Sequence, residues 1–167
     1  KNGFIFLQSA NMRRQLQSLD GAIETDAIES LISDDNACVV FSTALHPLLN
    51  RNVPVAACIL LGRTAQHYYE YFRRLLADLP ISLDEDDKLP WAGMTSDFSD
   101  AQRSGFLQAM SERLVEAKVC ASTDYARKRA SDFFAVRTAT AVDHSCLWFR
   151  AATFTFCARP NVSPRRS

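Results

Sequence analysis

The sequence predicts an α/β domain in which helices pack on a mixed sheet of about five strands. Two β-branched, apolar runs, at 37–43 and 53–61, follow one another closely, as paired strands do. A strongly amphipathic helical pattern covers 64–79, and strand-like and helix-like segments alternate after it. A strand pair followed by such alternation is typical of a sheet that combines antiparallel and parallel neighbours.

The N-terminal segment, residues 1–35, begins with the short apolar run GFIFLQ. The residues that follow, NMRRQLQSLD, predict one or two helical turns. The segment AIETDAIESLI, at 22–32, has apolar residues at helical spacing but is short, so a helix and a strand both remain open. If this segment is a strand, it precedes the strand pair and provides the first strand of the sheet.

The central strand pair is the clearest β signal in the chain. ACVVFST and VPVAACILL flank the connection LHPLLNRN, which contains the turn formers Pro47 and Asn50. These runs predict two antiparallel strands. Pro54 lacks a backbone N–H, so we expect it at the start of its strand or at a sheet edge.

The most secure helix follows this pair, in RTAQHYYEYFRRLLADL. Thr64 is the expected N-cap, and Pro80 ends the helix. One face carries an apolar stripe at i, i+3, i+4 spacing, formed by Tyr68, Tyr71, Phe72, Leu75, Leu76 and Leu79. The acidic stretch ISLDEDDKLP, at 81–90, is expected to be a solvated loop.

A second strand–helix unit is expected at 91–117. WAGMTSD, at 91–97, predicts a strand. Ser99 and Gln102 have the S-x-x-Q spacing of a capping box, which predicts a helix from there to about Ala117. Its inward residues are expected to be Phe106, Leu107, Met110 and Leu114.

The C-terminal part is harder to interpret. KVCAS, at 118–122, predicts a short strand, and DYARKRASDFFAV, at 124–136, predicts a helix with a basic outer face. In the divergent segment 137–167, CLWFRAATFTFCA is strand-like and SPRRS resembles a loose tail. Residues 36–136 are therefore the expected core, between the N-terminal segment and this divergent one.

Composition restricts the class of protein more than its function. The chain has 167 residues, and its 19 basic and 19 acidic side chains give zero net charge, which neither requires nor excludes a nucleic-acid partner. No apolar run reaches the ~18 residues of a membrane span, and no signal peptide is visible. The chain begins at Lys1 rather than Met, as a fragment would. The five cysteines, without a CxxC, favour reduced, buried thiols in an intracellular protein: Cys38, Cys58, Cys120, Cys146 and Cys157.

Three stretches together resemble a known family. LNRNVPVAACILLGRTAQHYYEYFRRLL, then MTSDFSDAQRSGF, then KVCASTDYARK are similar in order and spacing to the transposase domain of Mutator-like elements (MULE), especially its fungal members. The resemblance covers roughly residues 36–130. It implies a ribonuclease H-like fold, in which three antiparallel strands precede alternating helices and parallel strands. It also implies metal-dependent DNA strand cleavage and transfer, and a nuclear location.

The family's functional residues transfer to this chain only in part. Asp97 matches the second carboxylate of the acidic triad, although without the resemblance it would be interpreted as a turn residue. Asp26 is the best match to the first carboxylate; Asp34 and Asp35 are its rivals. The resemblance implies that Asp97 and Asp26 are catalytic ligands of Mg²⁺ or Mn²⁺, hard cations that prefer carboxylate oxygen.

Two departures from the family pattern predict an incomplete site. Cys120 matches the Cys of a C-x-x-H pair, but Thr123 stands at the His position, so no metal is expected there. The third acidic residue, a Glu on a late helix, has no counterpart; the last acidic residue is Asp143. We therefore expect a truncated or degenerate copy that does not complete catalysis by itself.

DNA is the expected partner, with a possible homo-oligomer as well. The basic residues that could contact phosphates are Arg73, Arg74, Arg127, Lys128 and Arg129. Two alternatives stay open: a non-catalytic domain that binds DNA or protein, and an unrelated α/β interaction module. The second would be favoured if residues 22–32 formed a helix with no strand beside 37–43.

Overall fold

The computed structural model describes residues 3–19, 21–29, 31–34, 36–81, 93–97 and 99–137, without the side chains of residues 97 and 135–137. Its elements, in chain order, are β1 (Phe4–Leu7), α1 (Ala10–Gln17), β2 (Ala22–Ile28), β3 (Cys38–His46), β4 (Arg51–Leu60), α2 (Ala65–Ala77), β5 (Gly93–Asp97), α3 (Asp100–Glu116), α4 (Thr123–Asp132) and β6 (Phe134–Arg137).

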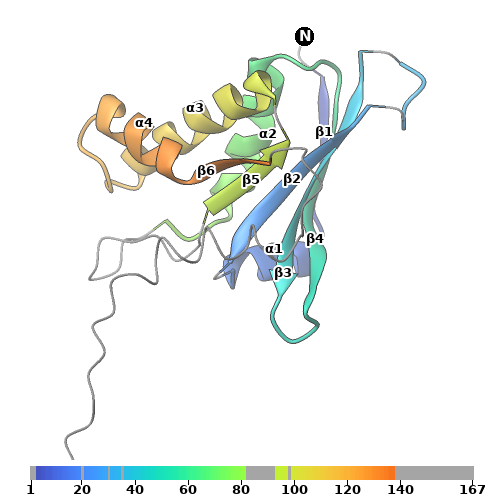
Figure 1. Cartoon of the computed structure of the whole chain (residues 1–167), viewed down its shortest axis with the longest axis horizontal. Coiled ribbons are helices and arrows are strands. Elements are labelled where there is room, and N and C mark those ends of the chain that lie inside the picture. The colour runs from blue at the N-terminus through green and yellow to red at the C-terminus, as the bar shows by residue number, and fades with distance from the viewer. Residues whose placement is uncertain are drawn as a thin grey trace, which may run out of the picture.

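The strands form one open sheet in the order β1-β4-β3-β2-β5-β6 (Figure 1). β2, β3 and β4 are antiparallel neighbours, whereas β5 runs parallel to β2 and β6 runs parallel to β5. The predicted α/β class and mixed sheet are therefore confirmed. The described sheet has six strands rather than about five, because Phe4–Leu7 pairs antiparallel with Ala57–Leu60 at the edge.

The ambiguous segment 22–32 contains a strand. β2 pairs with β3 from Ile23 opposite Ala44 to Ile28 opposite Val39. Ile23 and Thr25 are buried, whereas Glu24 and Asp26 are only half-buried, which is the period-two alternation of a strand. This pairing removes the condition that would have favoured an unrelated interaction module.

Two sequence predictions in the C-terminal part are wrong. Residues 118–122 form a turn instead of a strand: Lys118 has φ of 59°, and the N–H groups of Val119 and Cys120 bond to the carbonyl of Leu114. The helix expected over 124–136 ends at Asp132, and Phe134–Arg137 become β6. The first difference is local, because a helix C-cap with Lys118 in the left-handed region turns the chain at the end of α3. The second is tertiary, because the edge of β5 accepts Phe134–Arg137 as a parallel strand.

The helix-covered face of the sheet contains the core. The whole predicted stripe of α2 is buried, as are Phe106, Leu107, Met110 and Leu114 of α3. Phe72 and Phe106 meet edge to face, with ring centroids 5.5 Å apart. The two helices approach closely at Gly105, where an added Cβ would lie 2.6 Å from the backbone nitrogen of Tyr69.

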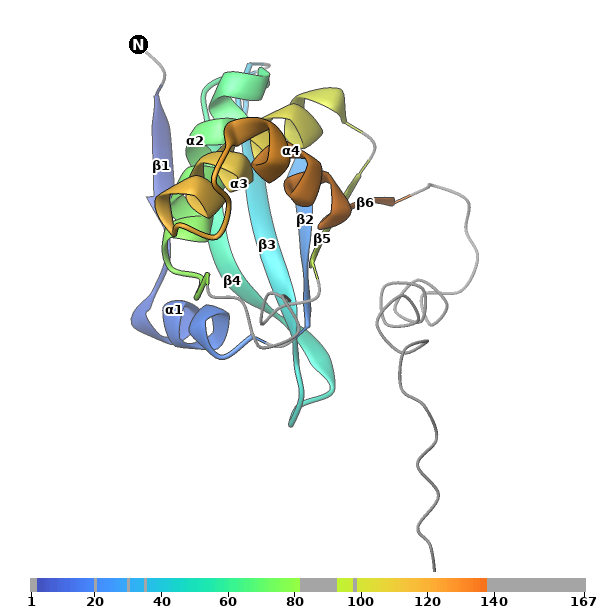
Figure 2. The same ribbon diagram turned by 90° about the vertical axis from the view of Figure 1, so that its left-hand side faces the viewer.

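The opposite face of the sheet, called here the open face, has no described helix on it. Figure 2 shows α2, α3 and α4 in front of the sheet, and α1 joins their side through the ion pair between Arg13 and Asp78 at 3.3 Å. On the open face, Ile5 is 57% exposed and Leu7 is 52% exposed, and Ile59 is half-buried. Among the described helices, none has the length and apolar character of a membrane span.

Candidate metal-binding strand ends

Asp26 lies near the carboxyl end of β2, a central strand of the sheet. It stands opposite Phe41 of β3 and is half-buried. One carboxylate oxygen, Oδ1, accepts a hydrogen bond from the Ala27 backbone N–H at 2.8 Å. Strand alternation places Asp26 on the open face with Glu24, because Thr25 between them faces the helices. Its second oxygen therefore lies on the side of the sheet that no described helix covers.

Asp97 is the last residue of β5, immediately beside β2. The parallel register pairs Ala22 with Gly93 and continues to Thr25 with Ser96. Positions 26 and 97 each follow directly on the last pair of this register, on neighbouring strands. The strand through Met94 therefore does run beside the strand that carries Asp26, as the resemblance implies.

A buried hydroxyl residue precedes each of the two aspartates. Thr25 is 1% exposed, and its Oγ1 lies 2.7 Å from the Ser42 Oγ. The Ser42 Oγ in turn lies 2.7 Å from the Tyr71 hydroxyl oxygen. Ser96 is also 1% exposed and donates a hydrogen bond to Oε1 of Gln102. Burial is the largest cause that raises the pKa of Tyr71, so its hydroxyl keeps its proton.

Sequence reasoning missed the role of Gln102. Ser99 caps α3 by accepting from the Gln102 N–H at 3.3 Å, as the capping box predicts. The Gln102 side chain, however, bonds to Ser96 of β5 instead of completing the box at the Ser99 backbone. The capping prediction is thus half correct, because a buried partner on the sheet competes for that side chain.

The described rival carboxylate, Asp34, lies outside β2 and β5. Asp34 lies in the connection between β2 and β3, exposed, where its Oδ1 accepts from the Asn36 N–H at 2.9 Å. Asp35 and Asp143 lie outside the described residues. Asp100 is exposed in the first turn of α3, where the helix dipole favours a carboxylate. Within the described ranges, no cluster of three or more His, Cys, Asp or Glu side chains could hold a metal ion.

Cys120 is a buried cysteine, in agreement with the sequence-based interpretation. It is 5% exposed, at the turn between α3 and α4. Thr123, at the position of the family's His, is the exposed first residue of α4. Cys38 and Cys58 are also buried, and burial raises the pKa of Cys58 to about 12. Cys146 and Cys157 lie outside the described residues.

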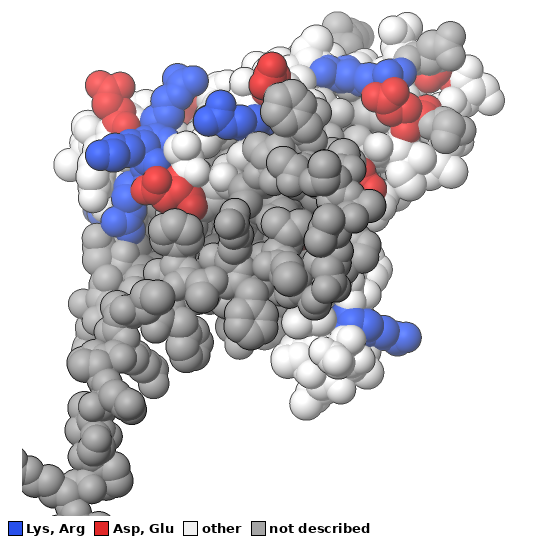
Figure 3. All heavy atoms as spheres, viewed as in Figure 1, with Lys and Arg blue, Asp and Glu red and all other residues white. Residues whose placement is uncertain are grey.

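The basic residues proposed for DNA contact fall on two helices. Arg73 and Arg74 are exposed on α2, where Arg73 pairs with Glu70 at 3.5 Å. Arg127 and Lys128 are exposed on α4 and Arg129 is half-buried there, while α3 contacts both helices. Figure 3 shows acidic side chains among the basic ones over the α4 end of the molecule. The basic residues of α2 and those of α4 therefore form two separate clusters.

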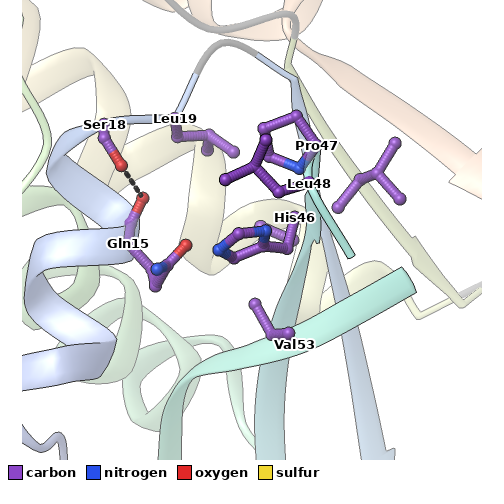
Figure 4. A pocket seen from close by; sticks show the side chains of 9 residues that line it. Gln15, Ser18, Leu19, His46, Pro47, Leu48 and Val53 are labelled. Atoms are coloured by element: carbon purple, nitrogen blue, oxygen red, sulfur yellow. Dashed lines mark hydrogen bonds between the residues drawn. The ribbon is translucent and has the colours of Figure 1, made fainter. Parts of the chain in front are cut away.

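A cavity of about 280 Å³ lies at the opposite end of the sheet, between α1 and the β3–β4 hairpin (Figure 4). His46 points toward it, but its Nδ1 accepts from the Leu49 N–H at 3.3 Å and so holds the turn. Ala44 of the lining stands beside Ile23, near the start of β2, whereas Asp26 lies near its end. The cavity is therefore separate from the two aspartates.

Comparisons of the chain with protein-family models, with curated proteins and with solved structures find no significant match.

Proposed function

We propose that this chain is the core of a ribonuclease H-like domain of the MULE transposase type, with a divalent-cation site at the carboxyl ends of β2 and β5. The observation that carries the proposal is the parallel register of β2 with β5, because positions 26 and 97 each follow directly on its last pair, Thr25 with Ser96. Apart from the edge strand β1 and the helix α1, three antiparallel strands precede a helix, a parallel strand, two further helices and another parallel strand. This order is the one that the resemblance implies.

The chemistry at such a site is phosphoryl transfer on DNA. Mg²⁺ or Mn²⁺ held by two carboxylates would activate the attacking oxygen and stabilise the leaving one. Asp26 has one oxygen bonded to its own backbone neighbour and one left to serve as a ligand. With the third carboxylate of the triad lacking a counterpart in the sequence, we propose that this chain binds the cation without completing strand cleavage.

A second candidate function is cation-independent binding of DNA or protein. The exposed Arg127 and Lys128 on α4, together with the incomplete triad, favour it. In this case phosphates of DNA would be contacted by α4, and a nuclear location would still follow. The two candidates differ in one measurable property, which is whether the fold responds to a divalent cation.

The experiment is a thermal unfolding titration with MnCl₂ and MgCl₂. Ligand at one hundred times its dissociation constant should stabilise the native chain by about 2.7 kcal/mol. Asp97→Asn and Asp26→Asn should each remove the cation-dependent rise in Tm. Asp100→Asn is the matched control, because this exposed carboxylate lies three residues beyond Asp97 on a different element. If the native chain shows no rise, or Asp97→Asn keeps it, the proposed cation site is wrong.

A further inference from the structure

We infer that two buried hydroxyl groups, those of Thr25 and Ser96, position the two aspartates that follow them, and that α2 and α3 hold these hydroxyls through Tyr71 and Gln102. The inference rests on the proposed function, because it assigns the positioning residues of that same site. It identifies residues that the family resemblance does not include.

The first connection runs from β2 to α2. The Thr25 hydroxyl bonds to Ser42 on β3, and Ser42 bonds to Tyr71, with both oxygen–oxygen distances 2.7 Å. All three residues are at most 1% exposed. The rigid phenol ring of Tyr71 thus fixes the distance between Thr25 and the helix layer. Through the backbone, it also fixes the position of Asp26, the next residue.

The second connection runs from β5 to α3 and reaches α2 as well. Ser96 bonds to Gln102, and Gln102 in turn hydrogen-bonds the hydroxyl of Tyr68. Tyr68 and Tyr71 are one turn apart on α2, so both connections end on the same face of one helix. The Thr25 hydroxyl also lies 3.8 Å from the sulfur of Met94, which joins the two strands directly.

The residue types support a positioning role over simple packing. A buried hydroxyl without a partner costs about 1–3 kcal/mol, whereas valine would fill the Thr25 site without that risk. A buried network in which every polar group is hydrogen-bonded holds its side chains in a single arrangement. A metal site requires this, because its ligands must stay within about 0.5 Å of the geometry that binds the ion. The placement of such a network directly before each aspartate therefore suits a pair of carboxylates that must converge.

The experiment measures Mn²⁺ affinity by the loss of the free-ion signal in electron paramagnetic resonance, in variants first shown by urea unfolding to be folded. Thr25→Val and Ser96→Ala should each weaken Mn²⁺ binding about tenfold, as loss of a supporting contact does in metal sites. Thr25→Ser keeps the hydroxyl and should bind within about twofold of the native chain. Tyr71→Phe and Gln102→Leu repeat the test from the helix side if a strand variant does not fold.

Matched controls remove side-chain hydrogen bonds elsewhere on α2 and α3. Ser111→Ala deletes a hydroxyl that is 3% exposed and bonds to the Leu107 carbonyl, and Tyr69→Phe deletes the α2 hydroxyl that bonds to Glu112 at 2.6 Å. Both controls should leave Mn²⁺ affinity unchanged. If Asp97→Asn abolishes binding but Thr25→Val and Ser96→Ala behave as Ser111→Ala does, the positioning inference is wrong and the proposed function stands. If the native chain does not bind Mn²⁺, both are overturned.

Discussion

The covered and open faces of the sheet are made from the same strands but differ in what they contribute. On β4, Leu60 faces the helices and is fully buried, whereas its neighbour Ile59 faces the other way and is half-buried. The covered face carries the core and the bonded hydroxyls, and the open face carries Asp26. The alternation of a strand thus places the packed core on one face of the sheet and the candidate ligand Asp26 on the other.

The largest expected effect tests this separation directly. Leu60→Ala and Ile59→Ala delete the same number of carbon atoms from adjacent residues. Leu60→Ala should lower the free energy of unfolding by about 3–4 kcal/mol, because it leaves a cavity in the packed layer. Ile59→Ala should cost about 1 kcal/mol, since less apolar surface returns to water. Urea unfolding measures both, and equal losses would show that the open face is covered as tightly as the other.

A smaller change in the free energy of unfolding is expected at the contact between α2 and α3. Gly105→Ala should destabilise the fold by about 2 kcal/mol, although alanine is the better helix former, because the new Cβ would press on the α2 backbone. The control is Ser104→Ala, at the exposed neighbouring position of α3, which should change stability by no more than about 0.5 kcal/mol. A stabilising Gly105→Ala would mean that α2 and α3 are further apart.

The smallest effect concerns the pH dependence of the polar groups on the covered side. Burial raises the pKa of Tyr68 to about 12, whereas the unfolded chain has a tyrosine pKa of about 10. The folded state therefore holds this proton more tightly, so its stabilising contribution is complete below pH ~10 and decreases as pH rises toward 12.

At pH 11 the loss from Tyr68 should be of order 1 kcal/mol. The stability difference between the native chain and Tyr68→Phe, measured by urea unfolding at pH 9 and pH 11, should shrink by that amount. A difference that is constant across this range would place Tyr68 in contact with water and would weaken the connection from Ser96 to α2.

The sequence by itself determined the elements whose pattern is local. The period-3.6 stripe of α2, the paired runs that become β3 and β4, and the Ser99 cap are each encoded within a few residues. In each of these elements, neighbouring residues alone carry the signal. The pairing of Asp26 with Asp97 is a prediction of the family resemblance.

Only the tertiary structure decided the features that depend on contacts between distant segments. Residues 22–28 became a strand because β3 and β5 flank them, and Phe4–Leu7 became an edge strand by pairing with β4. The hydroxyl connections from Thr25 and Ser96 to α2 and α3 join residues far apart along the chain. Their partners are set by register and packing, which no local pattern of residues specifies.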